Sequence, residues 1–205
     1  MKNQINIFSI LLLASLFIIS CSKKEQQLQN ETQNIKDMDG WYTGDGKEGE
    51  YGIGPETEKY NGMPVYYLRS KGKTENKSAD KFGTIIKNFP PAEYLGKRIK
   101  LSGYIKSDKV YGSAGMWLRI DGGNSNESTW GKTLEFDNMQ NRPIKETTDW
   151  KKYEIVSDVP KESRMLFYGA LLSGTGEIWI SGLKFDTVGT NIPPTTFIPQ
   201  KPYNP

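Results

Sequence analysis

Short runs in which apolar and polar residues alternate follow one another between residues 40 and 188. In the run 98–106, for example, Ile99, Leu101 and Ile105 fall on one side of an extended chain. A period of two is typical of a β-strand with one buried face. No segment repeats its apolar residues about every 3.6 positions over a helical length, and one turn at 91–95 is the best helical candidate.

Glycine, proline, asparagine and aspartate separate these runs and favour turns between them. The pattern therefore predicts an all-β fold, an antiparallel β-sandwich of about eight or nine short strands. The runs that define the strands are 65–70, 82–89, 98–106, 115–121, 132–137, 151–157, 165–173 and 177–186.

The first 20 residues have a different pattern. Lys2 precedes an almost wholly apolar run at 5–19, which ends at Ile18-Ile19-Ser20-Cys21. A run of about 15 residues suits a secretory signal and is shorter than the roughly 20 residues of a membrane-spanning helix. The last four residues resemble the lipobox of bacterial lipoproteins, although Ile19 is bulkier than the usual residue. An uncleaved signal anchor or a simple secretory peptide is the alternative.

The lipobox resemblance implies diacylglyceryl transfer to the thiol of Cys21, cleavage before it, and acylation of the new amino terminus, for instance with palmitate. Two or more acyl chains hold a protein firmly at a membrane, since each buried methylene contributes roughly 0.8 kcal/mol. Cys21 is the only cysteine, so an intramolecular disulfide is excluded. We expect a bacterial envelope protein held to a membrane through Cys21. By resemblance to proteobacterial sorting, Ser22 favours the outer membrane, with the leaflet left open.

Two segments without a strand pattern flank the alternating region 40–188, which suits one medium-sized domain. Residues 21–39, after the signal at 1–20, are polar and predict a flexible tether. Residues 189–205 contain five prolines and are either disordered or extended along the domain, with Phe197 and Tyr203 as candidate anchors.

Composition narrows the chemistry available to the chain. Histidine is absent, which excludes Ser-His-Asp and Cys-His catalysis and histidine metal sites. The net charge is +3 and basic residues are interleaved with acidic ones, so no basic patch predicts nucleic-acid binding. With Cys21 assigned to lipid, carboxylate chemistry or no catalysis remains, and we expect a protein that is not an enzyme.

Two stretches of sequence resemble a known kind of β-sandwich. The first is 82–106 with its continuation at 116–122. The second starts with Phe136-Asp-Asn-Met-Gln-Asn-Arg-Pro-Ile-Lys and ends in Gly174-Thr-Gly-Glu-Ile-Trp-Ile. They look like a jelly-roll module of the carbohydrate-binding, galactose-binding-like type, which recurs beside bacterial transcription regulators and hydrolases. The resemblance implies the jelly-roll fold, and sugar binding as an expectation, because a fold does not fix a function.

The resemblance also raises the question of a metal. Such modules often end their last strand with an Asp-Asp pair that helps to hold a structural calcium, where this chain has Ser181-Gly182. We therefore expect no cofactor, with calcium as the alternative. Its oxygen ligands would come from Asp45, Glu48, Glu56 and Asp186.

One strand carries a candidate binding face. Along 115–121, Trp117, Arg119 and Asp121 alternate with purely apolar residues, so they share the face directed away from the core. A flat ring beside a cation and a carboxylate suits a sugar, whose C–H faces stack while its hydroxyls take polar partners. The residues that can extend this face are Tyr104, Asn138, Gln140 and Arg142. The alternative is structural, with Trp117 packed under a loop and Arg119 paired with Asp121.

The remaining tryptophans and one carboxylate pair have other interpretations. Trp130, in a polar loop, is either a ligand clamp or a lid over the sandwich edge, whereas Trp150 and Trp179 occupy positions typical of core aromatics. Glu135 and Asp137 lie about 7 Å apart along one strand face, which overlaps the separation of a glycosidase pair. We interpret them as part of a solvated strand face, with a glycosidase pair as the alternative, since neither has an evident apolar pocket of the kind that keeps a general acid protonated.

The sequence as a whole predicts a membrane-anchored sandwich that binds a ligand, foremost a glycan, without catalysis. A protein-interaction module that docks on an envelope partner or an enzyme is the first alternative. A carboxylate hydrolase that uses Glu135 and Asp137 is a remote one.

Overall fold

The computed structural model describes residues 38–45, 49–71, 81–123 and 132–195. Cys21 with its lipobox, the tether before residue 38, Trp130 and the chain beyond residue 195 lie outside them. The chain divides into a unit that ends at Asp39 and a second unit, Gly40–Pro205, whose fold is described below. Among the described residues, no helix has the length and apolarity needed to cross a membrane.

The described part of the second unit is an antiparallel β-structure with one short 3-10 helix, which confirms the predicted all-β jelly-roll sandwich. Its elements are β1 (Tyr42–Asp45), β2 (Tyr51–Tyr60), β3 (Met63–Ser70), β4 (Phe82–Phe89), η1 (Ala92–Tyr94), β5 (Arg98–Gly122), β6 (Lys132–Asp137), β7 (Ile144–Asp158) and β8 (Ser163–Val188).

Strands β5 and β8 run through the whole sheet. They have 25 and 26 residues and pair from Arg98 opposite Val188 to Gly122 opposite Ser163. Strands β3 and β4 pair with successive parts of β8, and β7 and β6 pair mainly with successive parts of β5. We call the part with β2, β3 and β7 the β3 half, and the part with β1, β4 and β6 the β4 half.

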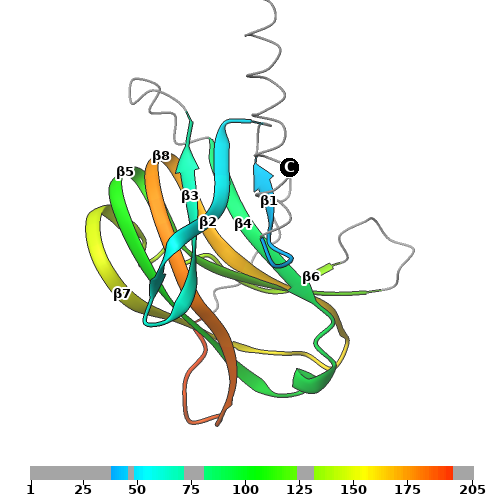
Figure 1. The fold of residues 1–205 in the computed structure, drawn as a ribbon. Helices are drawn as coiled ribbons and strands as arrows, with labels where there is room; N and C mark the ends of the chain where they lie inside the picture. Colours follow the sequence, from blue (N-terminus) through cyan, green and yellow to red (C-terminus); the bar gives the residue numbers. More distant parts are fainter. Residues whose placement is uncertain (1–37, 46–48, 72–80, 124–131, 196–205) are drawn as a thin grey trace, which may run out of the picture. The chain divides into compact units, whose positions relative to one another are not determined.

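The two halves pack face to face because β5 and β8 bend along their length (Figure 1). Tyr168, in the β4 half, contacts Phe185 of the same strand in the β3 half, with ring centroids 4.9 Å apart. Trp41 lies 5.8 Å from Tyr66 and 5.5 Å from Tyr168, so it contacts both halves. Fully buried aliphatic side chains fill the core between them: Leu68, Ile85, Ile99, Leu101, Ile105, Met116, Leu118, Ile120, Ile155, Leu166 and Leu172.

A bulge in β5 reverses which side chains face the core. Before it, odd-numbered residues such as Leu101 are buried, and after it even-numbered residues such as Met116 are. The register with β8 shifts between Asp108 and Tyr111, and Gly112 has a φ of 121°. An extra residue in one strand of a pair has this effect. It leaves the odd-numbered side chains after the bulge on the outer face of the β4 half.

Strand boundaries differ from the predicted ones in several places, and β7 begins at Ile144, seven residues before the predicted run 151–157. The runs 98–106 and 115–121 form the single strand β5, and the runs 165–173 and 177–186 form β8. The sequence pattern also did not predict β1 and β2. Residues 189–195, for which disorder and an extended path were both open, are hydrogen-bonded to the domain. Arg98 Nη1 donates to the carbonyl oxygens of Thr190 and Ile192, at 2.8 Å each.

Candidate ligand-binding groove

A groove of about 730 Å³ lies on the outer face of the β4 half. Its side chains come from β1, β4, β5, β6 and β8, so residues that are far apart in the sequence meet here. They are Tyr42, Gly44, Phe82, Thr84, Ile86, Ser113, Trp117, Arg119, Phe136, Asn138, Phe167, Leu171 and Ser173. The volume is within the range of about 300–1,000 Å³ that is typical of small-molecule sites.

Aromatic rings make up much of the groove wall. Phe82 and Tyr42 are the most exposed of them, at 47% and 38%. Trp117, the ring that the sequence singled out, lines the groove but is only 7% exposed, and its Nε1 has no hydrogen-bond partner among the described residues. Trp117 is therefore a wall of the groove, while Phe82 and Tyr42 offer the accessible ring surface.

Two polar groups in the groove lining are held in place by neighbours. The hydroxyl of Tyr42 accepts a hydrogen bond from Asn88 Nδ2 at 3.1 Å. Burial raises the pKa of Tyr42, an effect that Asn88 and Arg119 oppose, so its hydroxyl stays protonated at neutral pH. Thr84 donates to the carbonyl oxygen of Gly44 at 2.7 Å across the β1–β4 pair.

Arg119 is the charged side chain in the groove lining, and it forms an ion pair with Asp121. Their Nη2 and Oδ2 atoms are 3.0 Å apart, with Arg119 26% and Asp121 4% exposed. The guanidinium also lies 4.6 Å from the ring centre of Phe167. Burial raises the pKa of Asp121, whereas Arg119 and the hydroxyl of Thr133 lower it. Asp121 is outside the groove lining, so the pairing of Arg119 with Asp121 coexists with a groove position for Arg119.

The segment after β6 contributes one residue to the groove, whereas another of its residues stabilises the fold. Asn138 lines the groove, and its Oδ1 accepts from the backbone N–H of Gln140 at 3.2 Å. Arg142 is not among the lining residues and forms a two-point ion pair with Asp137, at 2.7 and 3.2 Å. Asp137 is 5% exposed, so the interpretation of a solvated strand face is wrong for this residue.

Three other sequence candidates lie away from the groove. Tyr104 packs against Tyr60, with ring centroids 5.2 Å apart, in the β3 half. Trp150 and Trp179, predicted in the core, are half-buried and line a second pocket instead. Trp130 lies outside the described residues.

The carboxylates considered for calcium do not gather in the described part of the chain, where no group of three or more His, Cys, Asp or Glu side chains has metal-site spacing. Glu56 accepts a hydrogen bond from Trp179 Nε1 at 3.2 Å, and Asp186 pairs with Lys184 at 3.0 Å. Glu48 and the side chain of Asp45 lie outside the description.

Comparison with curated proteins gives a relative that is a transcription regulator. Over 175 residues the chain is 35% identical to the uncharacterized HTH-type transcriptional regulator YbfP of Bacillus subtilis (strain 168). The match covers 85% of this chain and 55% of the regulator, so the chain spans about half the length of this relative. No family model matches the chain.

Solved structures share the fold at low sequence identity. The enzymatically active domain of bacteriophage CBA120 tailspike protein 4 superposes with a TM-score of 0.54 at 11% identity, over 76% of this chain and 20% of that one. Two carbohydrate-binding modules superpose less well. The CBM22-1 xylan-binding domain of Paenibacillus barcinonensis Xyn10C has a TM-score of 0.46 at 17% identity, over 73% of this chain and 86% of that one. The family 11 module of Clostridium thermocellum Lic26A-Cel5E has a TM-score of 0.48 at 12% identity, over 73% of this chain and 88% of that one.

Proposed function

We propose that this β-sandwich binds a glycan in the groove of the β4 half, without catalysis, and that lipid on Cys21 holds it at the bacterial envelope. The observation that carries the proposal is that two exposed rings, Phe82 and Tyr42, line the same groove as Arg119 and Asn138. Sugar C–H faces stack on such rings, and the guanidinium and amide groups donate to hydroxyl oxygens.

Neighbouring residues fix the side chains of Arg119 and Tyr42 before a ligand arrives, and this supports the proposed binding. Asp121 and Phe167 hold Arg119 on two sides, and Asn88 holds the hydroxyl of Tyr42. Side chains that are already fixed lose little conformational entropy when a ligand arrives, so more of the interaction energy is retained as affinity. The proposal includes no catalytic step, because Asp137 is occupied by Arg142 and by backbone and hydroxyl donors.

We expect Phe82→Ala to weaken glycan binding about tenfold, equivalent to about 1.4 kcal/mol, because one accessible stacking surface is lost. The full-length chain in detergent is screened on a glycan array, and the dissociation constant of the best glycan is then measured by calorimetry. Tyr111→Ala is the matched control, since Tyr111 is 51% exposed and lines no part of the groove. Equal affinities for both variants would place the site elsewhere. Failure of the parent chain to bind any glycan, together with capture of a defined envelope protein, would favour the protein-interaction alternative.

The anchor has a separate test. We expect Cys21→Ser to abolish labelling by an alkyne palmitate analogue and to move the protein out of the membrane fraction, because Cys21 is the only thiol in the chain. Ser22→Ala should keep both label and membrane association, and density separation of inner and outer membranes tests the proposed outer-membrane location. A labelled Cys21→Ser protein would contradict the lipobox assignment.

A further inference from the structure

A second pocket, of about 390 Å³, lies on the outer face of the β3 half. Its lining shares no residue with the groove of the β4 half. Trp179 faces outward here because Ile178 and Ile180, on either side of it in β8, are buried. Lys106 on β5 faces outward for the same reason, between the buried Ile105 and Ser107. The pocket is thus a feature of the strand pattern and not of a loop.

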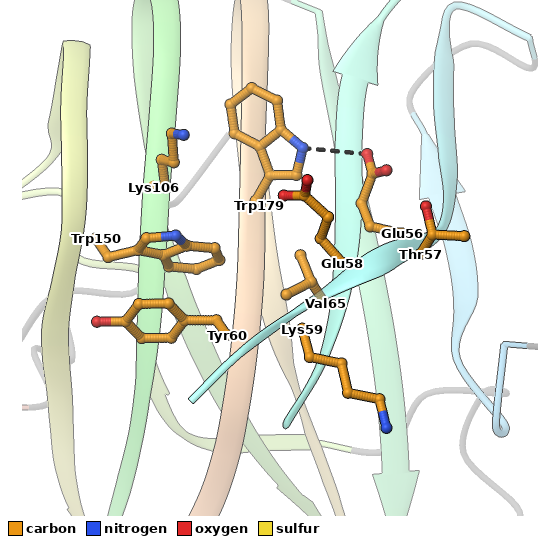
Figure 2. A pocket seen from close by; sticks show the side chains of 9 residues that line it. All are labelled: Glu56, Thr57, Glu58, Lys59, Tyr60, Val65, Lys106, Trp150 and Trp179. Carbon is orange, nitrogen blue, oxygen red and sulfur yellow. Dashed lines mark hydrogen bonds between the residues drawn. The ribbon is translucent and has the colours of Figure 1, made fainter. Parts of the chain in front are cut away.

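Two indole rings in the pocket are fixed by neighbours before any ligand is present (Figure 2). Trp150 stacks on Tyr60, with ring centroids 4.3 Å apart and planes 18° from parallel. One face of Trp150 is therefore covered, and Figure 2 shows the other face turned towards Lys106 and Trp179. Trp179 is held by the hydrogen bond from its Nε1 to Glu56 Oε1, 3.2 Å long.

Charged groups of both signs border these rings. Lys106 Nζ lies 5.4 Å from the ring centre of Trp179, so this ring already has a cation beside it. Glu58 is exposed, and its carboxylate points into the pocket in Figure 2. The pocket thus combines a ring face, a hydrogen-bond acceptor and a donor. A cationic ligand would meet the ammonium of Lys106 at Trp179, whereas a neutral hydroxylated ligand can use all three groups.

From this arrangement we infer a second binding site, in which a neutral pyranose stacks on Trp150 and places hydroxyl groups against Glu58 and Lys106. The site shares its class of ligand with the proposed function but none of its residues, so either can fail without the other. Two sites on opposite halves of the sandwich would let one anchored protein engage two sugar residues of a polymer or two chains. Such linkage raises avidity without any new contact.

The five tryptophans of the chain give a direct test, because each indole N–H has its own NMR signal. The ¹⁵N-labelled full-length chain in detergent is titrated with the methyl β-glycosides of glucose, galactose and xylose and, separately, with choline. Signals are assigned by single Trp→Phe variants. We expect saturable shifts of the Trp150 and Trp179 signals with at least one glycoside, while Trp41, in the core, stays unchanged.

A substitution of Glu58 tests the role of its carboxylate in the second pocket. Glu58→Gln should raise the dissociation constant of that glycoside at least about fivefold, because a charged acceptor is lost. Glu93→Gln, an exposed acid on η1, should leave it unchanged. Glu58 is exposed, so the fold tolerates its replacement. The inference is overturned if no glycoside shifts the two signals, if only Trp117 responds, if the shifts never saturate, or if choline saturates the site and the glycosides do not.

Discussion

We expect Gly174→Ala to lower the free energy of unfolding by about 3 kcal/mol or more. Gly174 lies in β8 opposite Gly112 of the β5 bulge and has a φ of 85°, a conformation that costs other residues about 1–2 kcal/mol. A Cβ atom there would also overlap the carbonyl oxygen of Tyr111 on β5. The strands cannot separate freely at this point, because Gly174 accepts a hydrogen bond from the hydroxyl of Tyr51 at 2.7 Å and donates to Lys81. Urea unfolding followed by tryptophan fluorescence measures the loss.

Gly62→Ala separates the two causes. Gly62, in the turn between β2 and β3, has a φ of 75°, but a Cβ atom there would have no neighbour within 4 Å. We expect a loss of about 1 kcal/mol for this variant, from backbone conformation alone. Equal losses for the two variants would show that the close approach of β5 and β8 contributes nothing. Because Ser173 lines the groove next to Gly174, a folded Gly174→Ala protein should also bind glycan more weakly.

The bulge in β5 explains why the strands were only partly predictable. Alternation identified the buried side chains on either side of it, such as Leu101 and Met116. The bulge interrupts the period of two, so the local pattern indicated separate strands where the chain is continuous. A bulge is set by backbone conformation at a few residues, here Lys109 with a φ of 47° and Gly112 with a φ of 121°. The pattern of apolar residues does not predict such a local conformation.

Strand β2 was missed for a different reason. It lies at the end of the strand order and pairs only with β3, so little of its surface faces the core. Residues 56–60 include three charged side chains, and Pro55 argues against a central strand. Such an edge strand has no hydrophobic face to recognise. The omission matters for the proposed second site, because Glu58 and Tyr60 of that pocket belong to β2.

Alternation of apolar and polar residues predicted only some of the groove residues. It placed Trp117 and Arg119 on an outer face, because that inference needs only their own strand. Phe82 and Tyr42 join them through the β1–β4 and β4–β8 pairing, and strand order cannot be derived from alternation within one strand. Trp179 was recoverable from sequence, since the flanking Ile178 and Ile180 fill the inward positions. Its size and apolarity favoured the core interpretation over the local pattern.

The Asp137 carboxylate should be the second large contributor to stability. It is 5% exposed and satisfies three groups: the guanidinium of Arg142, the backbone N–H of Met139 at 2.8 Å and the hydroxyl of Thr195 at 2.8 Å. We expect Asp137→Ala to lower the free energy of unfolding by about 3 kcal/mol, because these donors lose a charged partner in a largely buried site. Urea unfolding at neutral pH measures the loss.

Asp158→Ala is the matched control for an aspartate–arginine pair at the surface. Asp158 accepts from Arg98 Nε at 2.7 Å but is 52% exposed, so water replaces the lost partner and the effect should be much smaller. Equal losses would mean that burial of Asp137 adds nothing. Thr195 also accepts from the backbone N–H of Val156 at 2.9 Å, so its contact with Asp137 joins residues 189–195, the β6 end and β7. Asp137→Ala should therefore expose the amide of Thr195, which is bonded to Val156, to faster hydrogen exchange.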